Sequence, residues 1–89
     1  RLNMKKIPLD ILQEKARLLT KGELSNYILP KNLKDKLTLV VEQDGDDRVF
    51  ILFVPGHTPK DGKDISRVRI NEYSGKAIIE YIGLERKNK

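Results

Sequence analysis

The residues that could perform chemistry in this chain are few, and the most obvious of them lie in a loop. The only histidine, His57, is followed by Thr58 and Asp61 in a stretch rich in Gly and Pro. A general base needs an aligned partner and a nucleophile or a bound water molecule, and a loop position by itself supplies neither. We therefore interpret His57 as a surface histidine rather than as a catalytic or metal-binding residue.

A second candidate is the acidic cluster in which Asp44, Asp46 and Asp47 surround Gly45. Closely spaced carboxylates are ligands that Ca²⁺ accepts. The EF-hand pattern is not met, because Gly45 falls between the first two aspartates and no acidic residue closes the loop. We interpret the cluster as an acidic hairpin turn that keeps one end of a sheet soluble.

The remaining inventory also lacks the patterns of known reaction types. The chain contains no cysteine, which excludes disulfides, thiolate chemistry and zinc–cysteine sites. Its glycines form no phosphate-binding motif, and Ser25, Ser66 and Ser74 have no nucleophile-elbow context. We expect a protein that is not an enzyme and that holds no cofactor and no metal ion.

The charge balance raises the question of an anionic partner, since the net charge is +5 and charged residues make up 35% of the chain. Nucleic acid or anionic lipid is the usual partner for such a balance. Aromatic residues are not interleaved with the cations, however, as stacking recognition prefers. We favour a solvated surface and expect no nucleic acid, and we keep a small basic nucleic-acid-binding domain as the alternative.

The elements that position these residues are a helix followed by strands. Apolar residues recur at helical spacing at Ile11, Leu12, Ala16, Leu18 and Leu19. Pro8 suits the first turn, and Gly22 suits a stop. Beyond this helix the apolar residues mostly alternate, as in strands. The expected elements are a helix over residues 8–20, strands over 24–29, 36–42, 48–54, 65–70 and 76–83, and a hairpin loop over 43–47.

One helix and an antiparallel sheet of about four to five strands predict a two-layer α+β fold. We expect one domain over residues 1–89, with an ordered core at about 7–83. The strand over 48–54 is apolar on both faces, and one helix cannot cover both. Either another element covers the second face, or that face meets a protein partner or a second copy. The candidate partner surface comprises Val40, Phe50, Leu52 and Phe53.

The most specific stretch is the hairpin over residues 65–83. At its turn, Asn71 can bond backbone groups two residues ahead, and Gly75 can take a positive φ. Tyr73 and Ser74 lie between them and have no reacting partner in the sequence. We interpret all four residues as turn-forming rather than catalytic.

This hairpin and the order of elements resemble a PepSY domain. The resemblance covers about residues 7–83, and its specific part is the closing run VRINEYSGKAI at 68–78. The chain is most similar to the extracytoplasmic domain of PepSY-associated transmembrane proteins. It departs from the pattern at Asn71, where the family usually has an acidic residue.

The resemblance implies a non-catalytic interaction or regulatory module on the extracytoplasmic side of a bacterial cell membrane, in the periplasm or outside the cell. It implies that the chain is excised from a longer membrane protein. The implied partner is another protein or the rest of that membrane protein. The resemblance also suggests protease regulation or a link with iron acquisition.

Overall fold

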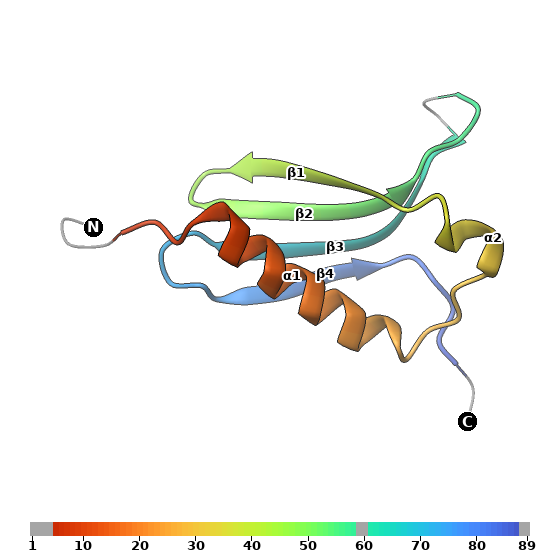
Figure 1. Ribbon diagram of the computed structural model, residues 1–89, viewed down its shortest axis with the longest axis horizontal. Helices are drawn as coiled ribbons and strands as arrows, with labels where there is room; N and C mark the ends of the chain where they lie inside the picture. Colours follow the sequence, from red (N-terminus) through yellow and green to blue (C-terminus); the bar gives the residue numbers. More distant parts are fainter. Residues whose placement is uncertain (1–4, 59–60, 88–89) are drawn as a thin grey trace.

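The computed structural model of the chain describes residues 5–58 and 61–87. A long helix packs on a four-stranded antiparallel sheet, which confirms the predicted two-layer α+β fold (Figure 1). The strands lie side by side in chain order. The elements are α1 (Leu9–Leu24), α2 (Lys31–Lys34), β1 (Thr38–Asp44), β2 (Asp47–Val54), β3 (Lys63–Asn71) and β4 (Ala77–Ile82).

The helix α1 is held to the sheet by one apolar stripe. Leu12 and Ala16, one turn apart, are buried against Phe50 of β2 and against Val68 and Ile70 of β3. Because a helix of this length is marginal by itself in water, this contact provides most of its stability. Of the residues predicted from their spacing, Leu12 and Ala16 therefore anchor the helix and Leu19 packs partly beside them. Ile11 and Leu18 are more than half exposed and do not.

The end of α1 differs from the prediction. Gly22 was the expected stop, but the helix continues to Leu24. The positive-φ glycines of the described chain are Gly45 and Gly75, so Gly22 does not have the left-handed conformation of a helix stop. A glycine inside a helix costs roughly 1 kcal/mol relative to alanine, so α1 continues past Gly22 at a modest cost.

The strand predicted over residues 24–29 is wrong. Among the described residues of this segment, an isolated bridge between Tyr27 and Arg86 is the only strand-like pairing. The guanidinium of Arg86 lies 5.3 Å from the centre of the Tyr27 ring, and Ile28 N donates to Glu85 O at 2.8 Å. Tyr27 and Ile28 of this segment thus pair with the chain beyond β4 instead of joining the sheet, and Leu24 belongs to α1.

The hairpin between β1 and β2 is tighter than the predicted loop over 43–47. Its turn consists of Gly45 and Asp46, and Asp44 pairs directly with Asp47. Gly45 has a φ of +62° at the first central position, where a type II′ turn prefers glycine. The register then continues without a bulge as far as the pair of Thr38 with Phe53.

The sheet has two faces with different cover. We call the face toward α1 the helix face and the opposite one the open face. The helix packs on β3, β4 and part of β2, and Figure 1 shows β1 beside it rather than beneath it. The helix face of β1 and of the adjoining part of β2 is therefore left partly uncovered.

Candidate functional site

A groove of about 620 Å³ lies where α1 leaves the sheet uncovered. Leu39 of β1 and Phe50 and Leu52 of β2 form its apolar floor. Its wall is the side of α1 that carries polar residues, and it comprises Asp10, Gln13, Glu14, Arg17, Thr20 and Lys21. The groove thus combines an apolar floor with a polar wall, and this wall forms its rim. An apolar centre with a polar rim is the usual arrangement of a protein-binding surface.

Exposure along the floor shows where the cover of α1 ends. Phe50 is 2% exposed beneath the helix, whereas Leu39 is 44% exposed. The two residues lie on the same face of adjacent strands, because Leu39 pairs with Leu52 and side chains alternate along a strand. An exposed leucine beside a covered phenylalanine marks an apolar surface that continues beyond α1.

The structure divides the predicted partner surface between the two faces. Phe50 and Leu52 face α1, whereas Val40 and Phe53 belong to the open face. Phe50 is a core residue packed against Leu12, so its assignment to an exposed surface has to be corrected. Leu52 is a partly buried residue of the groove floor. The four residues cannot meet one partner together.

The second apolar face of β2 is covered in a way that the sequence reasoning did not consider. Val49 is 1% exposed although α1 lies on the other face. Its direct cross-strand neighbour on β3 is Arg69, and that of Ile51 is Arg67. Long arginine side chains lay their aliphatic stems over apolar neighbours while the charged ends reach solvent or carboxylates. Neither a further element nor a partner is needed to cover these two residues.

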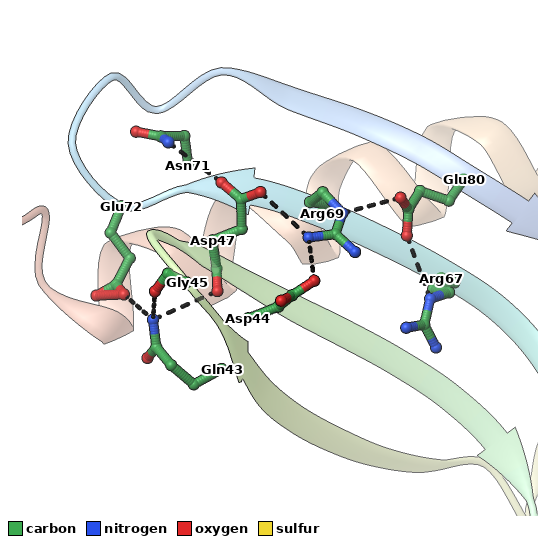
Figure 2. A network of polar contacts seen from close by, with 9 residues as sticks. All are labelled: Gln43, Asp44, Gly45, Asp47, Arg67, Arg69, Asn71, Glu72 and Glu80. Atoms are coloured by element: carbon green, nitrogen blue, oxygen red, sulfur yellow. Dashed lines mark hydrogen bonds and ion pairs between the residues drawn. The ribbon is translucent and has the colours of Figure 1, made fainter.

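The charged ends of these arginines form an ion-pair network on the open face (Figure 2). Arg69 Nη1 donates to Asp44 Oδ2 at 2.8 Å and to Asp47 Oδ2 at 3.1 Å. Arg69 Nε donates to Glu80 Oε2 at 2.8 Å, and Arg67 Nε donates to Glu80 Oε1 at 3.2 Å. The network joins all four strands. The hydrogen bond from Arg69 lowers the pKa of Glu80, which keeps its carboxylate charged.

A second polar cluster surrounds Glu72, which is only 2% exposed. Gln43 Nε2 donates to its Oε1, while Lys6 Nζ and Arg48 Nε each lie 3.7 Å from its Oε2. The hydrogen bond from Gln43, followed by the charges of Lys6 and Arg48, lowers the pKa of Glu72. The backbone of Glu72 also accepts a hydrogen bond from Ile7 N at 2.7 Å. Glu72 therefore joins the segment before α1 to β1 and β2.

The turn before β4 has the predicted conformation. Asn71 Oδ1 accepts hydrogen bonds from the backbone N of Tyr73 and of Ser74, each at 2.9 Å. Gly75 has a φ of +75°. Its carbonyl oxygen accepts a hydrogen bond from Lys15 Nζ of α1. These residues shape the turn and hold the helix beside it.

Among the described residues, neither His57 nor the acidic cluster around Gly45 has a catalytic or metal-binding arrangement. His57 lies in the loop after β2, where Asp61 N donates to Thr58 O at 3.0 Å; residues 59 and 60 of this loop lie outside the described residues. Asp44 and Asp47 point toward Arg69 rather than toward a shared centre. Within residues 5–58 and 61–87, no group of three or more His, Asp or Glu side chains is placed to hold a metal ion.

Comparisons of the chain with models of protein families, with curated proteins and with solved structures find no match. The resemblance to PepSY domains therefore rests on the sequence residues quoted above and stays a prediction. In the described part of the chain, no helix is both long enough and apolar enough to cross a membrane.

Sequence reasoning missed both the groove and the covering arginines. Arg67 and Arg69 alternate with Val68 and Ile70, which is an ordinary strand pattern. Their role becomes visible only when the register places them opposite Val49 and Ile51, and a single sequence does not specify that register.

Proposed function

We propose that this domain is a non-catalytic protein-binding module whose groove takes the apolar side of a helical segment of a protein partner. The observation that carries the proposal is the groove between α1 and the uncovered half of the sheet, with Leu39 and Leu52 in its floor.

The dimensions of the sheet favour a helix as the occupant. Adjacent strands lie roughly 4.8 Å apart, so the outer strands of a four-stranded sheet lie roughly 14 Å apart. A helix with its side chains is roughly 10 Å wide. The position of α1 over β3 and β4 therefore leaves room for about one further helix over β1 and β2. An apolar helix face lying in an apolar groove is a recurrent mode of recognition.

The rim of the groove suits such a partner. Gln13 and Thr20 of α1 carry uncharged polar groups, and Arg17 is already paired with Glu14 through hydrogen bonds of 3.0 and 2.6 Å. The pairing of Arg17 with Glu14 lowers the cost of covering these two charges, because burying a charge without a partner is costly. Asp10 and Lys21 of the same wall have no ion pair among the described residues, so a partner helix has to pair with them or leave them in solvent.

The proposal extends to where the module works and to which assembly it belongs. We place it on the extracytoplasmic side of a bacterial cell membrane, as part of a longer membrane protein. The partner helix then belongs to another protein or to the rest of that membrane protein, in protease regulation or in iron acquisition. The support for this part is the likeness of residues 68–78 to the closing hairpin of PepSY domains. Reporter fusions at this domain in the intact protein would test it, and activity of a cytoplasm-only reporter would contradict it.

The groove itself is tested with a displayed library of amphipathic helical peptides, which is panned against the chain. Dissociation constants of the selected peptides are then measured for Leu39→Glu and for a control, Ile78→Glu. Both residues are exposed and apolar, but Ile78 lies opposite Arg69 on the open face. Burying a leucine is worth roughly 1.5–3 kcal/mol, so Leu39→Glu should weaken binding about tenfold or more.

The control variant shows whether the peptides bind in the groove or on the open face. Ile78→Glu should leave the peptide affinities unchanged, and thermal unfolding of both variants checks that each remains folded. The proposal is wrong if the selected peptides bind Leu39→Glu as tightly as the parent chain. It is also wrong if Ile78→Glu is the variant that loses binding, because the binding surface would then be the open face.

A further inference from the structure

The free edge of β1 offers a second interaction site, separate from the groove. In the described part of the chain, β1 pairs with β2 alone. The pair of Asp44 with Asp47 closes a two-residue turn, so these residues exchange backbone hydrogen bonds. Hydrogen-bonded and non-bonded pairs then alternate along the hairpin. Consequently Leu39, Val41 and Gln43 direct their backbone N–H and C=O groups away from β2, toward the outside of the sheet.

This edge lacks the features that usually prevent strand addition. β1 reads TLVVEQD, so it contains no proline, glycine or lysine, and its pairing with β2 is continuous. The opposite edge strand, β4, differs. Its register with β3 shifts between Arg67 and Val68, which leaves Glu80 as an extra, bulged residue. A bulge disrupts the ladder and blunts an edge, so β1 is the edge that is open to pairing.

The charges along β1 indicate which strand fits there. The segment before β1 is basic, because it carries Lys31, Lys34 and Lys36 beside one acidic residue, Asp35. The end of β1 is acidic and carries Glu42 and Asp44, although Asp44 is also paired with Arg69. A second copy in antiparallel orientation places the basic end of each chain beside the acidic end of the other. A parallel copy would place like charges together. Opposite charges steer association and fix the relative orientation of partners.

We infer that two copies of this chain pair through their β1 edges, antiparallel and about a two-fold axis. Of the registers that bring the outward groups together, two pair most of β1 without placing Glu42 opposite Glu42: Val41 faces Val41 of the second copy, or Leu39 faces Val41 of the second copy. Lys36, in the turn before β1, is then brought near Asp46 of the following turn or near Asp44, respectively. The contact is self-complementary, as the interface of a two-fold dimer has to be.

The pairing makes one continuous sheet with both α1 helices on the same face. The two grooves become neighbours, and β2 and β1 of each copy form a shared floor between the two helices. One edge strand on each side buries less area than a standard interface, so the dimer is weak and depends on concentration. The inference does not rest on what occupies the groove.

The first test follows the oligomeric state and the backbone amides of the chain. Sedimentation equilibrium over a range of concentrations should show a monomer–dimer equilibrium. Hydrogen exchange should slow with concentration at the outward amides of Leu39, Val41 and Gln43. The amides of Val40 and Glu42 bond to β2 already, so their exchange by local opening should change little. A chain that remains monomeric at every concentration overturns the inference, and so does a dimer whose outward amides exchange unchanged.

The second test reverses charge at one end of the edge. Lys36→Glu removes the net positive charge of the segment before β1, where Lys31 and Lys34 remain, and should weaken dimerisation about tenfold, because the change acts twice in a two-fold contact. The control is Lys63→Glu, an equal reversal at the start of β3 that should leave dimerisation unchanged. Glu42→Lys removes the net negative charge of the other end, where Asp44 remains, and mixing it with Lys36→Glu should restore pairing as a heterodimer. Failure of the mixture to pair more tightly than either variant alone would contradict the antiparallel arrangement.

The two proposals can fail independently. Lys36 does not line the groove, so its reversal tests only the edge. Loss of helical-peptide binding in Leu39→Glu, measured at concentrations where the chain is monomeric, tests only the groove. A monomeric chain that still selects helical peptides would remove the dimer and leave the proposed function in place.

Discussion

Single side chains at the turn end of the sheet perform two tasks at once, and Asn71 is the clearest case. Its Oδ1 accepts from the backbone N of Tyr73 and Ser74, while its Nδ2 donates to Asp47 Oδ1 at 3.1 Å. A carboxylate could accept the first two hydrogen bonds but could not donate the third. This explains why an amide is suitable here, where PepSY domains usually have an acidic residue.

The charge of Glu72 is the residue-scale feature with the plainest pH dependence. Its folded-state pKa is lowered, first by the hydrogen bond from Gln43 and then by Lys6 and Arg48. A lowered carboxyl pKa contributes stability that is fully present above the unfolded pKa of about 4.3 and is lost as the pH falls through the folded pKa. Among the described residues, Arg48 Nε finds no hydrogen-bond partner, so it depends on this nearby charge.

We therefore predict that Glu72→Gln lowers the free energy of unfolding by roughly 1–3 kcal/mol at neutral pH, as expected when a buried charged hydrogen bond is lost. The difference from the parent chain should begin to shrink as the pH falls below the unfolded-state pKa of about 4.3. It should disappear only below the lowered folded-state pKa of Glu72, where the parent is protonated as well. Urea unfolding at several pH values measures both effects. Glu42→Gln, at an exposed carboxylate of β1, is the control and should change little. Equal stability of Glu72→Gln and the parent at neutral pH would contradict the prediction.

At the scale of elements, β3 stabilises both faces of the sheet. Val68 and Ile70 complete the core beneath α1, and Arg67 and Arg69 cover the apolar side of β2. Exposed ion pairs contribute little by themselves. The arginine stems are therefore the larger part of what β3 contributes to the open face.

Substitution of Arg69 separates these two contributions. Arg69→Ala removes both stem and charge and should lower Tm by about 4–8 °C, the usual shift for a modest loss in a domain of this size. Arg69→Met keeps an apolar stem over Val49 and should lose about half as much or less. Calorimetry or thermal denaturation followed by circular dichroism measures both variants. If Met is as destabilising as Ala, the ion pairs rather than the stem stabilise this face.

The regular parts of the fold could be predicted from local patterns. Leu12 and Ala16 indicate the buried stripe of α1 through their spacing, and Asn71 and Gly75 indicate the turn before β4 through the chemistry of their side chains and backbone. Each of these signals lies within a few residues of the structure that it specifies. The extent of α1 beyond Gly22 could not be predicted in this way, because glycine marks only some helix ends and is tolerated inside other helices.

The site could not be predicted for a related reason. Whether Leu39 is covered depends on how far α1 shifts across the sheet, and whether Val49 needs a partner depends on its pairing with Arg69. Both are relations between elements distant in the sequence. The predicted surface therefore named suitable residue types on β1 and β2 but combined residues from opposite faces, as Phe50 and Phe53 show.

At the scale of the whole molecule, the net charge of +5 overstates how basic the surface is to a polyanion. Arg17 is paired with Glu14, Arg67 and Arg69 with Glu80, and Arg48 lies beside Glu72. Pairing within the molecule reduces the field that these arginines present to a ligand. The lysines before β1 still form a small basic region, and in the proposed dimer this region lies beside the β1 edge.

We predict that the chain shows no specific binding to nucleic acid. A titration of fluorescent single- and double-stranded oligonucleotides at low salt should give at most weak binding that disappears with a small increase in salt. A nucleic-acid-binding domain would instead lose affinity in proportion to the number of phosphates that it contacts. Tight binding with a steep salt slope would favour the alternative of a basic nucleic-acid-binding domain over a protein-binding module.

The bulge at Glu80 has a consequence for how far self-association can proceed. In a pair joined through β1, both outermost strands are β4, and each has the ladder interrupted at Glu80. A third copy would have to add to an interrupted edge, which is far less favourable than the first pairing. Assembly therefore stops at two chains, and a concentrated solution should contain closed pairs rather than growing fibres. Removing the bulge, rather than strengthening β1, is the change that would turn this sheet into an open-ended polymer.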